Sequence, residues 1–373
     1  VTWTQVAQYI VLIIAYLLPV FWISNKMGAG FFPHLMLADE VARIAELEGQ
    51  FGFVKNSAAD LATVPKGLAG ITKAHSSVNG TNWGFISLAI CMMAGTASLP
   101  HVMMRYFTTP SVKTARRSVA WSLLFIFLLY STAPMLATLS KLSLIDPTLS
   151  TGIIGKSIAD VQAIDWYQNW NQANLMFVSD FNGNGTLELN EFFMGGKAVV
   201  LATPEIAGLP YVISGLVAAG GMAAAMSTAD GLVLAIANAL SHDLYYKIID
   251  PKAETAKRLI VARVLLVLIG FAGATIAALE IQGILGSVIW AFDFAMSGLF
   301  FPLVLGVWWK RANAQGAVAG MLLGLAAGTW YLVHVRTGGT PLWGVTQLTF
   351  GIIGSLVSLV SMVVVSLLTK APD

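Results

Sequence analysis

Residues 180 to 191 carry oxygen-donating side chains at the spacing of a calcium loop. With Asp180 at position one, donors fall at positions three, five and nine, a turn glycine falls at six and a glutamate at twelve. The candidate ligands are Asp180, Asn182, Asn184, Thr186, Glu188 and Glu191. Asparagine at positions three and five lowers the negative charge, so we expect weak Ca²⁺ binding, on the order of 10⁻⁴–10⁻³ M. A structural turn that holds no ion is the alternative.

A second group of oxygen donors lies among the small residues 220–231. Ser227 and Thr228 are adjacent hydroxyls in an apolar stretch, and such oxygens can bind a hard cation such as Na⁺. Serine and threonine in membrane helices also bond back to carbonyls of their own helix, which is the alternative. Asp230 follows closely, and a carboxylate at membrane depth is costly enough to suggest a function.

Another carboxylate, Asp293, stands between aromatic residues about nine residues into an apolar stretch. At a rise of ~1.5 Å per residue it is expected near the middle of a bilayer. A structural partner such as a neighbouring hydroxyl would explain it. A role in relaying a proton or cation is the other interpretation, and both stay open.

Residues 95–101 combine a glycine, small hydroxyls and Pro100 within an apolar stretch. We expect a helix break over residues 95–99 and a new half-helix from Pro100, which suits a first helical turn. Irregular backbone at that depth lines a cavity or is buried in protein, and the positive end of the half-helix suits an anionic group. The candidate substrate residues are Gly95, Thr96, Ser98 and His101. A proline kink filled by neighbouring helices is the alternative.

Composition indicates which elements position these residues. Hydrophobic residues make up 57% of the 373 residues and charged residues 11%, whereas soluble proteins have roughly 45–50% and about 25%. A crossing needs about 20 apolar residues. Eight stretches qualify, at 4–24, 83–107, 118–140, 208–240, 259–279, 284–308, 315–335 and 346–368. The sequence therefore predicts an all-α polytopic membrane protein with about eight transmembrane helices.

Two long connections are expected outside the cell, because Lys and Arg concentrate in the connections of the opposite face. The first, residues 25–80, contains a helical period of apolar residues with a charged face. We expect that helix to lie along the membrane surface or to cover the protein, as a solvated lid or, alternatively, a ligand-binding element. The second, residues 141–207, holds the calcium-like loop.

Several classes of function are disfavoured. The net charge of +2 carries no nucleic-acid signal, and the lone Cys91 excludes disulfides within the chain and is expected to be a packing residue. No nucleophile motif, paired intramembrane carboxylates or metal-binding histidines indicate an enzyme. The chain begins Val1-Thr2-Trp3 without a signal peptide, so we expect it to be the C-terminal part of a longer protein.

The chain resembles the solute:sodium symporter family, most closely its cation/acetate symporter branch. The resemblance extends over nearly the whole chain, although the calcium-like loop departs from the best-known members. It rests on residues 2–8, 95–101, 104–108, 225–230 and 241–245.

The resemblance implies an inverted-repeat fold of the leucine-transporter type, with residues 1–373 supplying core helices five to ten and two more. Ser227, Thr228 and the carbonyl of Ala224 would bind sodium, and the broken helix would line the substrate cavity. Nothing matches the family's first core helix, which supplies the remaining ligands. A missing N-terminal half, or a small membrane subunit, is therefore expected as a partner.

The expected function is sodium-coupled import of a small monocarboxylate, such as acetate, pyruvate or lactate, across a bacterial inner membrane by alternating access. The alternatives are a symporter-like membrane sensor module, or a sodium symporter for another small solute such as proline or a sugar. Either way, the expected partners are a small solute, sodium and the lipid bilayer.

Overall fold

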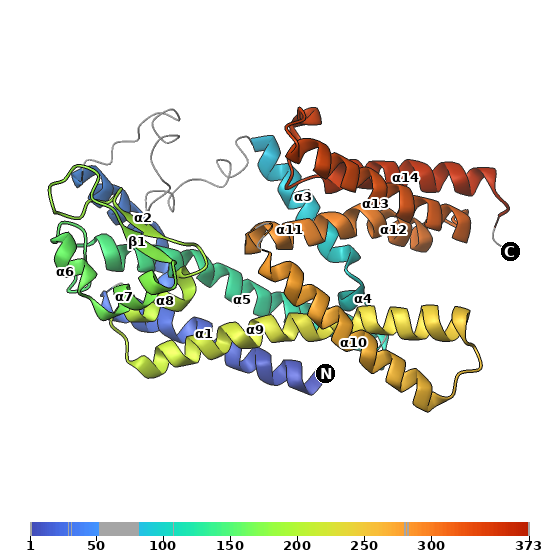
Figure 1. Ribbon diagram of the computed structural model, residues 1–373, viewed down its shortest axis with the longest axis horizontal. Helices are drawn as coiled ribbons and strands as arrows, with labels where there is room; N and C mark the ends of the chain where they lie inside the picture. Colours follow the sequence, from blue (N-terminus) through green and yellow to red (C-terminus); the bar gives the residue numbers. More distant parts are fainter. Residues whose placement is uncertain are drawn as a thin grey trace. The chain divides into compact units, whose positions relative to one another are not determined.

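A computed structural model describes residues 2–28, 30, 32–51, 82–106, 108–279, 281 and 283–371. The chain divides into two compact units. The first combines Val1–Lys73 with Arg116–Gly231, and the second combines Ala74–Ala115 with Leu232–Asp373. Each unit is described by itself below, with the element labels of Figure 1.

Seven helices of the described residues are long and apolar enough to cross a membrane. They are Trp3–Lys26, Val112–Ile145, Tyr211–Ile249, Thr255–Ala278, Ile284–Trp308, Ala314–Arg336 and Gly351–Leu368. The second of the eight predicted spans, residues 83–107, is divided into two helices that are each too short to qualify. The all-α polytopic fold is thus confirmed, and the span that does not qualify is the one in which a helix break was expected.

The first unit contains α1 (Thr2–Lys26) and most of two further long helices, α5 (Val112–Ile145) and α9 (Tyr211–Asn238). Their shared core contains Val20 and Ile23 of α1, Met135 and Leu139 of α5, and Val217 of α9. A Cβ atom at Gly220 would collide with the Cβ of Ala15, so this glycine allows the backbones of α1 and α9 to approach closely. Figure 1 shows these two helices side by side.

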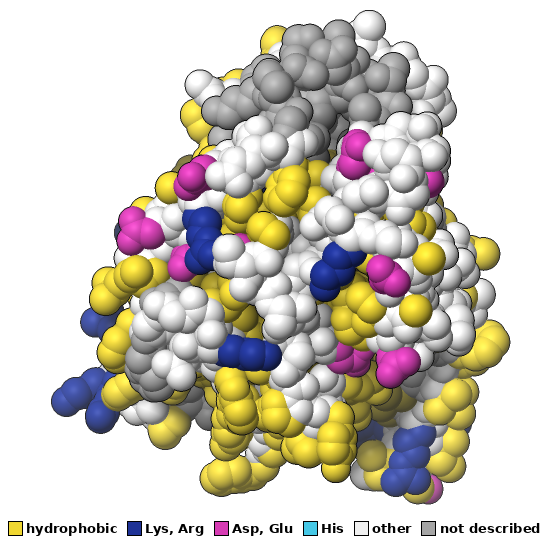
Figure 2. Space-filling view, turned by 90° about the vertical axis from the view of Figure 1, so that its left-hand side faces the viewer, with side chains coloured by type: hydrophobic (Ala, Val, Ile, Leu, Met, Phe, Trp, Pro, Cys, Tyr) yellow, Lys and Arg dark blue, Asp and Glu magenta, His cyan; other side chains and the backbone are white. Residues whose placement is uncertain are grey.

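The predicted external connection 141–207 is a folded lobe at one end of the first unit (Figure 1). After α5 it contains α6 (Ile158–Gln162), α7 (Asp165–Gln172), β1 (Met176–Val178), β2 (Phe192–Met194) and α8 (Val199–Ile206). The strands pair antiparallel with Phe177 opposite Phe193. The core of the lobe includes Leu187, Leu189 and Phe192, all fully or almost fully buried. Figure 2 shows acidic and basic side chains dispersed over this end of the molecule.

The predicted amphipathic helix is α2 (Pro33–Gln50), and it covers the lobe. Its apolar residues Ile44 and Leu47 are buried in the core of the lobe, which accounts for the helical period of the sequence. The remainder of the predicted connection, residues 52–80, lies outside the described residues.

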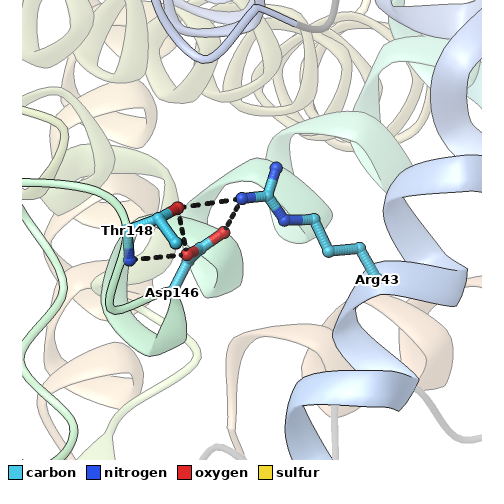
Figure 3. Close-up of polar contacts among 3 residues, drawn as sticks. All are labelled: Arg43, Asp146 and Thr148. Atoms are coloured by element: carbon cyan, nitrogen blue, oxygen red, sulfur yellow. Dashed lines mark hydrogen bonds and ion pairs between the residues drawn. The ribbon is translucent and has the colours of Figure 1, made fainter.

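Two ion pairs connect α2 to the lobe. The Arg43 guanidinium contacts the carboxylate of Asp146, whose side chain is 1% exposed. The hydroxyl of Thr148 donates to Asp146 Oδ1 at 2.6 Å, and Arg43 donates to the Thr148 hydroxyl at 3.0 Å (Figure 3). The fully buried ammonium of Lys141 pairs with Glu48. These contacts compensate the buried charges and fix the position of α2 along the lobe.

The second unit contains the C-terminal helices and the broken helix. Its elements are α3 (Asn82–Ser98), α4 (Pro100–Tyr106), η4 (Ala239–Ile249, π-helical), α10 (Thr255–Ala278), α11 (Ile284–Ala295), η5 (Met296–Phe300, π-helical), α12 (Phe301–Trp308), α13 (Ala314–Arg336), η6 (Leu342–Gly344) and α14 (Gly351–Leu368). Helix α10 buries none of its residues, so its whole apolar surface is available to lipid or to other parts of the protein.

Glycines determine how α13 and α14 pack in the second unit. Gly316, Gly320, Gly324 and Gly328 recur at every fourth position of α13 and are all buried. The first three face α14, where Gly354, Ser358 and Ser366 are among their neighbours, and Gly328 faces Ser297 of η5. This small-xxx-small pattern lets two membrane helices meet backbone to backbone, and Figure 1 shows α13 and α14 side by side.

Candidate functional site

The helix break predicted before Pro100 is present, but it is shorter than expected. Helix α3 ends at Ser98, Leu99 is not helical and α4 begins at Pro100. Pro100 has no backbone N–H to donate, which explains the interruption. The N–H groups of Val102 and Met103 both donate to the Leu99 carbonyl at 3.1 Å, so α4 resumes immediately after the break.

The expectation of irregular backbone over residues 95–98 was wrong, because the hydroxyls there support the helix. Thr96 Oγ1 donates to the Met92 carbonyl and Ser98 Oγ donates to the Ala94 carbonyl, both at 2.6 Å. This back-bonding is common for serine and threonine in membrane helices. The helix therefore continues to Ser98 and breaks only where the proline requires it.

The four candidate substrate residues have different environments. A Cβ at Gly95 would lie 2.5 Å from the Phe292 carbonyl oxygen, so Gly95 is a contact between α3 and α11. Ser98 is fully buried, whereas Thr96 is exposed and His101 is half-buried. Thr96 and His101 are consequently the two members of the set whose side chains reach accessible surface.

The sodium candidates on α9 meet at one carbonyl. Ser227 Oγ donates to the Ala224 carbonyl at 2.9 Å and Thr228 Oγ1 donates to the same oxygen at 3.4 Å. This is the bonding within one helix that was named as the alternative, and it also brings three oxygens of the predicted set together. Each hydroxyl uses its hydrogen in this bond and keeps oxygen lone pairs that can contact a cation.

Sequence reasoning missed Gln5, which joins this oxygen cluster from α1. Its side-chain Nε2 donates to the Ser227 carbonyl at 3.2 Å, across 222 residues of sequence. The two amides of a mainly apolar span, Gln5 and Gln8, were the available signal. The bond connects α1 and α9 at the level of the candidate sodium residues.

A cavity of about 330 Å³ in the first unit also adjoins Ala224. Its walls are almost wholly apolar and come from α1, α5, α8 and α9, with the Tyr16 and Tyr130 rings among them. None of Gly95, Thr96, Ser98 and His101 lines it. Ala224 is the one sodium candidate among the lining residues.

The two carboxylates expected at membrane depth differ in environment. Asp230 is half-buried and makes no hydrogen bond or ion pair within the described part of the chain. Asp293 is fully buried in α11, and Cys91 next to it is also fully buried, as expected of a packing residue. A Cβ at Gly351 would lie 2.9 Å from Asp293 Oδ1. The carboxylate thus faces the first turn of α14, where the helix dipole favours a negative charge.

The predicted calcium loop joins β1 and β2 of the lobe. Gly185, at the turn position of the pattern, has a φ of 71°, which glycine adopts without strain. Asn182 and Asn184 both donate through Nδ2 to Glu188 Oε1, at 2.7 and 3.1 Å. Three of the six candidate ligands therefore converge on one point.

Comparisons with known proteins agree with this architecture. A sequence profile of the sodium:solute symporter family matches residues 1–147 and 197–324, on either side of the calcium-like loop. An uncharacterised symporter of Cupriavidus necator is 42% identical over 295 residues, covering 76% of this chain and 42% of that protein. A monocarboxylic acid transporter of Corynebacterium glutamicum is 27% identical over 247 residues, covering 66% and 37% respectively.

A solved structure supports the fold. A Na⁺-coupled sialic acid symporter, captured in a substrate-bound outward-open state, matches with a TM-score of 0.56 and 17% sequence identity. The match covers 100% of this chain and 62% of the symporter chain. The chain spans about two fifths of the length of the two relatives named above. The resemblance recognised in the sequence is confirmed: this multi-pass membrane protein belongs to the sodium:solute symporter family.

Proposed function

We propose that this chain forms part of a sodium-coupled symporter that imports a small monocarboxylate across a bacterial inner membrane. The observation that carries the proposal is the convergence of Ser227, Thr228 and Ala224 oxygens in a family of sodium symporters. The family supports a transporter. The monocarboxylate is supported by the relative from Corynebacterium glutamicum.

The sodium ion would contact the hydroxyl oxygens of Ser227 and Thr228 and the Ala224 carbonyl. Three oxygens are fewer than a hard cation normally takes, so further ligands must come from elsewhere in the protein or from a small membrane subunit. Sodium would favour the conformation that binds substrate, because a ligand shifts an equilibrium towards the state for which it has the higher affinity. Rocking of helices around the site would then carry both solutes inward.

The substrate would approach the broken helix. Thr96 and His101 are the candidate contacts that reach accessible surface. His101 can donate a ring N–H to a carboxylate, whereas the Thr96 hydroxyl would first have to leave the Met92 carbonyl. Gly95 and Ser98 would act indirectly. Gly95 allows α3 to pack closely against α11, and Ser98 stabilises the end of α3 through its bond to the Ala94 carbonyl. Asp230 and Asp293 remain proposals for coupling residues.

The substrate class is tested by uptake into liposomes that contain the full-length protein. Labelled acetate, pyruvate, lactate, proline and glucose are compared with external sodium or with choline in its place. We expect sodium to stimulate uptake of at least one monocarboxylate and not that of proline or glucose. The opposite selectivity would refute the substrate class, and binding without uptake of any solute would favour a sensor module.

The sodium site is tested in the same liposomes with the double variant Ser227→Ala, Thr228→Ala. We expect sodium stimulation of uptake to be lost, because two of the three oxygens disappear. The matched control is Thr329→Ala, which removes another hydroxyl bonded to its own helix, to the Leu325 carbonyl at 2.7 Å. Unchanged sodium stimulation in the double variant would contradict the assignment.

A further inference from the structure

The loop Asp180–Glu191 holds its first and last carboxylates in fixed orientations. Asp180 Oδ1 accepts the N–H of Gly183 at 2.8 Å and Oδ2 accepts that of Gly185 at 3.0 Å. Glu191 Oε1 accepts the N–H of Phe181 at 2.9 Å and Oε2 accepts that of Glu188 at 3.0 Å. Backbone N–H groups of the loop therefore hold both end carboxylates in place.

The middle of the loop brings three more side chains to one point. Two amide groups, from Asn182 and Asn184, surround a single carboxylate oxygen of Glu188. The amide oxygens of Asn182 and Asn184 now accept the N–H groups of Asn184 and Thr186, at 2.9 and 2.7 Å. Rotation of each amide about its terminal bond would exchange that bond for an oxygen at the point where the nitrogen now lies. A cation there would contact the same Glu188 carboxylate that now accepts the two N–H groups.

The charge of the loop independently indicates a cation. Glu191 is 1% exposed, and its two carboxylate oxygens accept backbone N–H groups but have no basic partner among the described residues. Buried charges in proteins are commonly paired or coordinate metal ions. Among the described residues no ion pair involves Asp180, Glu188 or Glu191. Three acidic groups thus lie within one twelve-residue loop without a basic partner, and a divalent cation would compensate them.

The donor set favours Ca²⁺ over other cations. It provides carboxylate and amide oxygens at positions one, three, five, nine and twelve, and position seven, Thr186, can supply a backbone carbonyl. A glutamate at the last position can bind through both oxygens, which fits the six to eight ligands of Ca²⁺ better than the strict octahedron of Mg²⁺.

We propose that the loop Asp180–Glu191 is a calcium site that stabilises the lobe. The loop is tied to the preceding segment, because Gly155 N–H donates to the Leu187 carbonyl and Leu187 N–H donates to the Lys156 carbonyl, both at 2.8 Å. Leu187 and Leu189, within the loop, belong to the core of the lobe. Calcium bound to the loop therefore strengthens the contacts of β1, β2 and the segment before α6.

The expected affinity is low. Two of the donors are neutral asparagines, so the site carries fewer charges than sites that bind calcium tightly. A dissociation constant on the order of 10⁻⁴–10⁻³ M is typical of extracellular modules. That range suits a lobe on the outer face of a membrane, where the sequence places residues 141–207.

The site is tested by equilibrium dialysis of the purified 373-residue chain in detergent against ⁴⁵Ca²⁺. We expect one bound ion per chain, displaced by unlabelled Ca²⁺ but not by equal Mg²⁺. Glu191→Gln should weaken binding at least about tenfold, because it removes a charged ligand. Asp160→Asn is the matched control, since it neutralises an exposed carboxylate of the lobe outside the loop.

A variant with higher expected affinity distinguishes the loss of a calcium ligand from simple misfolding of a variant. Asn184→Asp adds a carboxylate at position five, and we expect it to tighten calcium binding several-fold. The unfolding temperature of the chain should rise with calcium, and more so in Asn184→Asp than in Glu191→Gln. The proposal is overturned if the chain binds no Ca²⁺ up to about 10 mM, ten times the upper limit of the expected range. Equal binding by Glu191→Gln and the unsubstituted chain would overturn it as well.

Discussion

Replacement of Gly324 by alanine should separate α13 from α14. An added Cβ would lie 2.7 Å from the Cβ of Ser358 and 3.1 Å from the Gly354 carbonyl, and it would collide with the Ser297 carbonyl. Two of these three neighbours are backbone atoms, which cannot rotate away. Overpacking of this kind costs typically about 1–3 kcal/mol of folding free energy.

The same helix offers a graded comparison. A Cβ at Gly320 would lie 3.0 Å from the Cβ of Met362 and 3.1 Å from the Ser358 carbonyl, with no closer contact. We therefore expect Gly320→Ala to cost less than Gly324→Ala. Gly270 of α10 has nothing within 4 Å of an added Cβ, so Gly270→Ala should be neutral or gain up to about 1 kcal/mol of helix propensity.

The assay is the unfolding of the three purified variants by a denaturing detergent, followed by circular dichroism. The expected order of stability is Gly270→Ala, then Gly320→Ala, then Gly324→Ala as the least stable. If Gly324→Ala and Gly270→Ala unfold at the same detergent fraction, the close packing of α13 on α14 through glycines is refuted.

Two further predictions concern the helix that covers the lobe. Arg43→Ala leaves the buried Asp146 carboxylate without its basic partner and should lower the free energy of unfolding by about 1–3 kcal/mol. The cost is limited because Arg43 is 38% exposed and its ion pair is partly screened by solvent. Thermal unfolding measures the loss of stability, and Arg43→Lys should lose less than Arg43→Ala. Burial raises the pKa of the Glu40 carboxyl above its ordinary 4.5 and outweighs the opposing effect of Arg43. The folded protein therefore binds this proton more tightly than the unfolded chain does. Its stability falls as the pH rises from about 4.5 through the raised pKa. Glu40→Gln should therefore raise the unfolding temperature at pH ~7, with a smaller gain near pH ~4.5, and an equal gain at both would contradict the assigned cause.

Much of the fold follows from local sequence. Pro100 predicts the helix break, because a residue without a backbone N–H has the same effect in any helix. The extent of the break could not be predicted, since it depends on whether the Thr96 and Ser98 hydroxyls bond to their own helix or to something else. The glycines at every fourth position of α13 are also a local pattern, and they indicate close packing of membrane helices.

Contacts between distant segments limited the prediction of the sites. The bond from Gln5 to the Ser227 carbonyl joins helices far apart in the chain, and no local pattern specifies it. The lobe was expected only as a connection, because its short helices and strands are too brief to show a clear period. Its core forms when Leu187 and Leu189 meet Ile44 of α2, which again lies far away in sequence.

The most direct test of the account is whether a sodium gradient alone drives accumulation of a monocarboxylate by the full-length protein in liposomes. We predict that labelled substrate rises above its external concentration when sodium is higher outside, and that a sodium ionophore abolishes this accumulation. Accumulation driven equally well by a proton gradient without sodium, or equilibration unaffected by the ionophore, would contradict sodium-coupled symport.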